Sequence, residues 1–416
     1  MALKTIACTK CGSPVPLRAL GVTVNVACEA CGSVLDLSDP NRKVLLQNKF
    51  KDEYPPKLAM GSRCTLEGTS WEVIGQQVRQ DLRWHFTWEE YLLFNPRYGF
   101  RWLVCSDGHW VWVKTQAQLT ATLNANAGSV VYQSTTFRKY HAGTAKTVFV
   151  RGEFYWRLSA GDAVAYADYI APPHQFSIEG GPLEQTVSLG TYLPTGVLVE
   201  AFGLERSPTR PAGVAPTQPN PFSPARQLVW LYPLLLGILL AVQLVLDGLS
   251  PRTEVLRSEA ITARDSAGVL PEATYGPFQV AKGPVKTQVQ LFTQEDNSWV
   301  DFEAVLYNST TQEVRSFYLG AEYYHGTDAG ESWSEGSTRA TVTLAGLPAG
   351  TYYLTLEGQV EANGMPHAWQ VRVVTGGVYW GNWWLAVVIL SLVCGVYYLL
   401  YQQFEVKRWA DSDYTV

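Results

Sequence analysis

The chain has 416 residues, enough for two to four domains that each bury a core of their own. Its composition is 47% hydrophobic, 12% aromatic and 17% charged, which is apolar for a soluble protein and polar for a polytopic transporter, and fits a few membrane spans among globular domains. The net charge of -5, with Lys and Arg scattered along the chain, offers no field that attracts a polyanion, so nucleic-acid binding is not expected.

The N-terminal region lacks the apolar stretch and the small-residue cleavage site of a secretory signal. We therefore expect it to stay in the reducing compartment where the chain is made. Four of the seven cysteines fall within residues 1–45, in two CxxCG knuckles separated by sixteen residues: Cys8, Cys11, Cys28 and Cys31. Four thiolates satisfy tetrahedral Zn²⁺, and so small a module has too little core to fold without such a link.

The spacing therefore predicts a zinc ribbon over residues 1–45 that holds one structural Zn²⁺. The alternative, a redox CxxC, is typical of a single motif in a βαβ context, which is absent here. The knuckles contain no aromatic side chain on which a base could stack, so the ribbon is expected to contact protein.

Short strands broken by turn residues dominate the region that follows. The segment from Gly68 to Trp71 weakly resembles the segment from Gly152 to Trp156. This internal repeat predicts two related small β-barrels or sandwiches, over residues 57–135 and 136–205. Residues 206–226 are rich in proline and are expected to form an extended tether rather than a packed element.

Over most of its length the chain resembles an uncharacterised bacterial membrane family, a domain of unknown function with an N-terminal zinc ribbon. The resemblance rests on the two knuckles and on these groups: Glu90-Tyr91-Leu92, Gly108-His109-Trp110, Gly152-Glu153, Trp156, Gly161-Asp162, Asp168 to Pro173, and Gly190 to Leu193. The family usually has a tryptophan and a glutamate where Val187 and Thr191 stand here. Its genes often lie near those of spermidine-synthase-like and envelope-stress proteins, so the resemblance implies a cellular context and no mechanism.

Two uncharged apolar runs, residues 228–246 and 383–401, are long enough to cross a ~30 Å hydrocarbon core as helices. Five basic residues lie near the outer ends of the two runs, and three lie on the segment between them. By the positive-inside rule this bias favours cytoplasmic termini. We expect a bacterial inner-membrane protein that contacts lipid through two spans, with a cytosolic tail at 402–416 and residues 251–380 extracytoplasmic.

Residues 251–380 are expected to form an antiparallel β-sandwich, since polar and apolar side chains alternate along runs such as Val285 to Leu291. An acidic, glycine-rich loop carries Asp328, Glu331 and Glu335, which could hold calcium or a cationic ligand. The spacing matches no known calcium loop, so a solvated hairpin is the alternative. The overall fold class is multi-domain and mainly β.

No catalytic motif is recognisable in the sequence. The residues that could serve an enzyme of the cytosolic region are His85, His109, His141, His174, Asp81, Glu89, Glu90 and Asp168. We assign no catalytic residue and favour a membrane-anchored adaptor or sensor, or a complex subunit, with membrane or cytosolic protein partners and self-association allowed. The alternatives are a hydrolase or transferase, and a polyamine-binding or transport-complex subunit in which carboxylates form an acidic groove.

Overall fold

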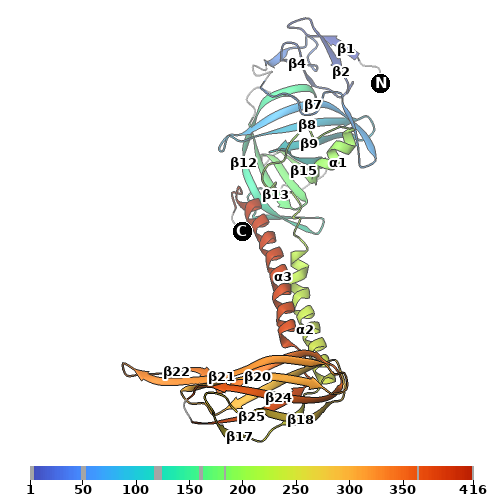
Figure 1. The fold of residues 1–416 in the computed structure, drawn as a ribbon. Helices are drawn as coiled ribbons and strands as arrows, with labels where there is room; N and C mark the ends of the chain where they lie inside the picture. Colours follow the sequence, from blue (N-terminus) through green and yellow to red (C-terminus); the bar gives the residue numbers. More distant parts are fainter. Residues whose placement is uncertain are drawn as a thin grey trace. The chain divides into compact units, whose positions relative to one another are not determined.

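The computed structural model describes residues 4–47, 53–116, 124–158, 163–181, 184–362 and 365–414. Gly161 and Asp162, part of the family resemblance, lie outside these ranges. The chain forms two compact units, one of residues 1–228 with 395–416 and one of residues 229–394. Each is mainly β, as predicted, and two long helices run through the chain (Figure 1).

The N-terminal knuckles do not form a separate module. Strands β1 (Lys4–Ala7) and β2 (Pro14–Leu17) pair only with each other, whereas β3 (Asn25–Ala27), β4 (Ser33–Asp36) and β5 (Val44–Gln47) extend a larger sheet. Strand β3 pairs with the long strand β12 (Thr135–Phe154), with Ala27 opposite Gly152. The ribbon is therefore continuous with the next sheet.

That sheet closes into a single barrel. Its strands, in chain order, are β6 (Arg63–Leu66), β7 (Thr69–Asp81), β8 (Thr87–Asn95), β9 (Gly99–Ser106), β10 (His109–Gln116), β11 (Ser129–Tyr132), β12, β13 (Ala163–Ala171), β14 (His174–Gly181) and β15 (Glu184–Leu193). The antiparallel order β7-β8-β9-β10-β15-β14-β13-β12 closes because β12 also pairs with β7. The prediction of two β-units is wrong, because the repeated segments are neighbouring strands of one barrel.

Closure brings two backbones into close approach. Gly152 lies opposite Gly75, and a Cβ on Gly152 would collide with the carbonyl oxygen of Ile74. Gly152 also has φ +78, which side chains disfavour. Glycine at this position lets β12 and β7 meet, and the buried side chains of Ile74 and Phe154 pack beside the seam.

The outer face of the barrel carries a second apolar layer. Helix α1 (Thr195–Phe202) follows β15 and packs its buried Leu198 against Trp71, Trp110 and their neighbours. The helix ends at Gly203, which adopts the left-handed conformation typical of a helix C-terminus.

Residues 206–226 do not behave as the unpacked tether that their proline content predicts. Ala215, Thr217 and Asn220 are 8%, 1% and 8% exposed. The carbonyl oxygens of Ala215 and Pro216 accept hydrogen bonds from Arg408. The segment is irregular in backbone yet packed, because another part of the chain supplies its donors.

Helices α2 (Ala225–Leu249) and α3 (Trp380–Trp409) contain the two predicted apolar runs and extend beyond them. Both are long and apolar enough to cross a membrane. The Tyr232 hydroxyl lies 2.6 Å from the Ser391 hydroxyl, a polar link between the two helices. Residues 402–409 of the predicted tail continue α3 as a helix.

The second unit contains two antiparallel sheets around one core. The strands are β16 (Thr253–Arg257), β17 (Ile261–Arg264), β18 (Ala273–Val280), β19 (Val285–Thr293), β20 (Ser298–Asn308), β21 (Val314–Asp328), β22 (Glu331–Ser337), β23 (Arg339–Leu347), β24 (Gly350–Val360) and β25 (Pro366–Thr375). The strand order in the first sheet is β16-β25-β19-β23, with β17 also paired to β25, and the order in the second sheet is β18-β24-β20-β21-β22. The predicted alternation holds in β19, whose Val289 and Leu291 are fully buried in the core with Phe302 of β20.

Glu153 joins the ribbon to the barrel and provides a test of their continuity. Its buried carboxylate accepts hydrogen bonds from the backbone N–H groups of Arg18 and Ala19, at 2.5 and 3.0 Å, and from the Thr23 hydroxyl at 2.6 Å. Glu153→Gln keeps the shape and removes the charge, so we expect the unit to lose about 1–3 kcal/mol of stability. Thermal unfolding of the full-length protein in detergent would show a lower midpoint, while Glu200→Gln, at an exposed carboxylate of α1, would not. Equal midpoints for the two variants would contradict the role given to Glu153.

Candidate functional sites

The four predicted cysteine ligands come together in the structure. The Sγ atoms of Cys8, Cys11, Cys28 and Cys31 all lie within 4.8 Å of one another. Sγ of Cys8 lies 3.8 Å from Sγ of Cys31, and Sγ of Cys11 lies 3.7 Å from Sγ of Cys28. Within the described residues this is the group of cysteine, histidine and carboxylate side chains that could hold a metal ion.

The two knuckles reach this arrangement by the same backbone turn. Gly12 donates its N–H to the Cys8 carbonyl at 2.9 Å, and Gly32 donates to the Cys28 carbonyl at 2.8 Å. Both glycines have a positive φ, of 76° and 73°. Burial raises the pKa of the Cys28 thiol to about 12, so a bound cation is what would favour its thiolate. The donor set fits a metal ion held by four thiolates.

A second cluster lies inside the barrel. The Arg79 guanidinium of β7 donates to the Glu179 carboxylate of β14 at 2.7 Å, although two strands separate β7 from β14 in the ring. The Tyr166 hydroxyl of β13 likewise donates to Asp81 of β7 at 3.0 Å. Contacts between strands that are not neighbours must cross the lumen, so these side chains point inward.

The lumenal cluster is rich in carboxylates. Glu90 lies 3.6 Å from Arg79 and accepts from the Trp88 indole at 2.6 Å, and Asp168 accepts from the Ser177 hydroxyl at 2.5 Å. Burial raises the pKa values of Asp168 and Glu179 despite the opposing effect of nearby groups. Ionising these carboxylates in the interior therefore costs solvation free energy.

Strand β12 carries a bulge on the wall of this cluster. Lys139 is opposite Tyr169 and His141 is opposite Asp168, so Tyr140 is an extra residue with no partner in β13. Its free carbonyl oxygen accepts a hydrogen bond from the Ser412 hydroxyl at 2.6 Å and from the Asp413 N–H at 3.1 Å. The C-terminal residues thus bind the barrel at its bulge.

Further contacts fix the end of α3 at the same place. The Tyr140 hydroxyl donates to the Arg408 carbonyl at 2.9 Å, and the Asp413 carboxylate lies 2.8 Å from Nδ1 of His141. Arg408 is 1% exposed and pairs with Glu405 at 2.9 Å. We call residues 405–414 with their partners in β12 and residues 215–220 the tail dock.

Lys57, Glu89 and Cys105 form a different group around a pocket of about 230 Å³. Lys57 Nζ lies 2.6 Å from Glu89 and 3.7 Å from the Cys105 sulfur. Burial raises the pKa of the Cys105 thiol to about 11. A protonated thiol is a poor nucleophile, so the group resembles a structural ion pair more than a catalytic centre.

The candidate residues from the sequence divide between these places. Asp81, Glu90, Asp168 and His141 meet in or beside the lumen, while Glu89 points to the opposite face of β8. His109 contacts the Tyr192 hydroxyl and the Ala212 carbonyl with its two ring nitrogens, which marks a structural histidine. His85 and His174 are exposed. Sequence reasoning missed Arg79, Glu179 and Tyr166, because only the register of non-adjacent strands brings them to the cluster.

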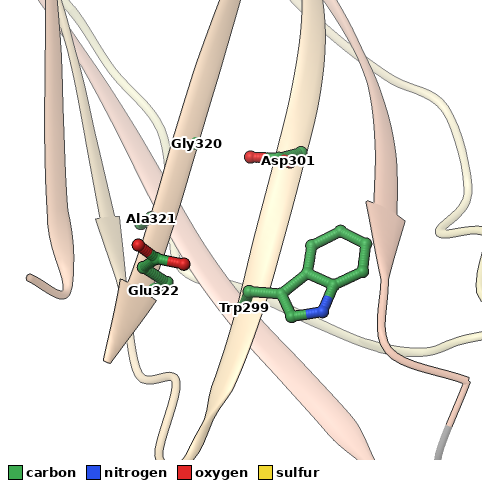
Figure 2. A pocket seen from close by; sticks show the side chains of 5 residues that line it. All are labelled: Trp299, Asp301, Gly320, Ala321 and Glu322. Carbon is green, nitrogen blue, oxygen red and sulfur yellow. The ribbon is translucent and has the colours of Figure 1, made fainter. Parts of the chain in front are cut away.

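In the second unit, Asp328, Glu331 and Glu335 are all exposed on the hairpin of β21 and β22. A hollow of about 460 Å³ lies instead over β20 and β21, lined by Trp299, Asp301, Gly320, Ala321 and Glu322. Figure 2 shows the Asp301 carboxylate reaching toward the side-chain-free position at Gly320. No sequence pattern predicts this hollow, which depends on the pairing of Asp301 with Gly320.

Comparison with known proteins identifies one domain. Residues 59–195 match the family model described as Domain of unknown function (DUF4178), a range that contains β6 to β15 and so the whole closed barrel. No curated protein matches the chain. A solved structure of the N-terminal endo-1,4-beta-D-xylanase 10B of Clostridium thermocellum, with its CBM22-1 and GH10 modules and xylohexaose, is 14% identical over 31% of this chain and 25% of its own, with a TM-score of 0.19. So low a score supports no argument.

The cysteine cluster predicts one metal ion per chain. Elemental analysis of the purified full-length protein should find about one equivalent of a thiolate-binding metal, and Cys28→Ser should remove most of it, because the remaining three thiolates leave the site open. Cys64→Ala is the matched control, since Cys64 is a buried thiol of the barrel outside the cluster. Metal that persists in Cys28→Ser, or is lost equally in both variants, would rule out the cluster as the site.

Proposed function

We propose that this protein is a membrane-anchored sensor or adaptor, in which the state of the barrel is transmitted to the second membrane helix through the tail dock. The observation that carries the proposal is the attachment of the end of α3 to β12 through Tyr140, His141 and Arg408. A helix that only anchored the barrel would need no such attachment.

The dock and the lumen share one strand. His141 contacts the tail through Nδ1, and the residue directly opposite it in β13 is the lumenal Asp168. A change in the lumen therefore reaches the tail over the width of one side chain. The contacts along this path are specific polar contacts, which a switch of the proposed kind would form in one state and break in the other.

The proposal includes a location and an orientation. Two apolar helices support a bacterial inner-membrane protein with both termini in the cytoplasm, and Lys407 and Arg408 follow the second apolar run. The sandwich of residues 251–380 then lies outside the cytoplasm, where its lack of cysteine suits an oxidising space.

Zinc is the metal we propose for the cysteine cluster, in a structural role. A tetrahedral ion with Zn–S bonds of ~2.3 Å separates its sulfur ligands by about 3.8 Å. The spacings of 3.8 Å and 3.7 Å between Cys8 and Cys31 and between Cys11 and Cys28 support this ion. Four thiolates leave no position for a substrate, so the metal would stabilise the ribbon and take no part in a reaction.

The tail dock can be tested at Arg408. Arg408→Met removes the donors to Ala215 and Pro216 while keeping much of the side-chain volume. We expect backbone amides of residues 215–220 and 410–414 to exchange hydrogen about tenfold faster, which corresponds to a loss of about 1.4 kcal/mol of local stability. Lys407→Met is the control, because it removes the same charge from an exposed neighbour. If both variants exchange like the wild type, the dock does not hold the helix.

The orientation can be tested by labelling introduced cysteines in intact cells or spheroplasts, in a Cys394→Ala background. A membrane-impermeant thiol reagent should label Ser332→Cys, at the exposed hairpin of the sandwich, and should miss Glu205→Cys, at an exposed position after α1. The background protein without either cysteine reports labelling of the remaining thiols. The reverse pattern would invert the topology and place the ribbon outside the reducing cytoplasm.

A further inference from the structure

The lumen of the barrel has an excess of negative charge. Asp81, Glu90, Asp168 and Glu179 point into it, and among the described residues Arg79 is the one Lys or Arg side chain that forms ion pairs with any of them. Asp81 and Glu90 each accept several hydrogen bonds from uncharged groups. The Asp81 carboxylate accepts two backbone N–H groups and the Tyr166 hydroxyl, and Glu90 accepts from Gln77 and Trp88.

Asp168 and Glu179 are less well compensated. Burial raises the pKa of Asp168, although the carboxylate accepts hydrogen bonds from Ser177 and Gln175 and lies in the field of Arg79 and of any positive charge on His141. Glu179 shares Arg79 with Glu90, and its side chain is partly buried, with 38% of its surface exposed. Both carboxylates lie on the same face of the sheet, because Asp168 is opposite Ser177, two residues before Glu179.

An unsatisfied acceptor lies beside them. The Asp413 carboxylate can only accept, so Nδ1 of His141 carries the proton in their 2.8 Å contact. In the neutral ring Nε2 is then a hydrogen-bond acceptor, and it has no partner among the described residues although His141 is 8% exposed. His141 is directly opposite Asp168, on the same face of the sheet. While the ring is neutral, a donor from outside the chain would satisfy this buried acceptor.

We infer that the barrel lumen binds a small organic cation, an alkylammonium ion, whose N–H groups donate to Asp168, Glu179 and Nε2 of His141. An ammonium group has three donors and no acceptor, which complements a site made of acceptors. The rings of Trp88 and Tyr166, 5.8 Å apart, line the same cluster and can contact the alkyl chain or the charge. An anion or a neutral acceptor would leave the carboxylates uncompensated.

The inference deepens the proposed function, since it names the class of signal. Ligand and tail would use the two nitrogens of one imidazole ring, so binding at Nε2 changes the contact at Nδ1 with Asp413. The ligand site does not depend on that coupling and can be measured separately.

The test is calorimetric titration of the purified full-length protein in detergent with linear alkyl monoamines and diamines, and with alcohols and diols of equal length as neutral controls. We expect saturable binding of at least one amine and none of its alcohol counterpart. Asp168→Asn and Glu179→Gln keep side-chain shape and should each weaken binding about tenfold or more, because each removes a charged acceptor. Glu200→Gln should bind as the wild type does.

Absence of saturable amine binding to the wild-type protein would overturn the inference. Equal binding of amine and alcohol, or equal affinities of wild type and both lumenal variants, would overturn it too. The wild-type comparison of amine with alcohol decides the question even if a variant misfolds. Hydrogen exchange of residues 410–414 separates the two ideas: amine binding without a change in the tail leaves the site intact and refutes the sensor coupling.

Discussion

Strand β12 is the constraint on which the rest of the first unit depends. Its 20 residues, Thr135–Phe154, pair with β3 of the ribbon, with β7 across the seam, and with β11 and β13. Without the close approach of Gly152 and Gly75 the sheet would stay open and its edge strands would expose unpaired backbone groups. Closure satisfies those groups and creates an enclosed lumen. The ribbon, the lumen and the tail dock then all share one rigid element.

Closure of the barrel changes the solvation of the charged side chains in its interior. On an open sheet, Arg79 and Glu179 would be solvated side chains worth little to stability. In the lumen they meet at 2.7 Å across two intervening strands, and burial raises the pKa values of Asp168 and Glu179. The opposite end of the same face is apolar, with Ile74, Leu92 and Phe154 buried. One end of the interior is thus apolar and stabilises the fold, whereas the other end is polar and costs stability. A buried polar cluster that costs stability is typical of a binding site.

The bulge at Tyr140 has a comparable double role. One extra residue disrupts the pairing of β12 with β13 and leaves a carbonyl oxygen free. The tail supplies its partners through Ser412 and Asp413, and the same turn of chain brings His141 to the Asp413 carboxylate. Lys407 and Arg408 are adjacent and equally basic, yet Lys407 is exposed and Arg408 is buried against the proline-rich segment. Lys407 is solvated, whereas Arg408 attaches the helix to the barrel.

Local sequence patterns were enough to predict several features of the chain. Cysteine spacing predicted the group of four thiols, uncharged apolar runs located the two long helices, and two-residue alternation identified the strands of the sandwich. Features that depend on pairing between distant segments became visible only in the folded chain. The repeat of Gly68 to Trp71 at Gly152 to Trp156 marks one closed barrel and not two units, because β7 and β12 pair with each other. The lumenal contacts of Arg79 and Tyr166 and the dock of Arg408 join positions that lie 85 to 193 residues apart in the sequence. No periodicity in the chain encodes such contacts, since they follow from the ring order of the strands and the register of one bulge.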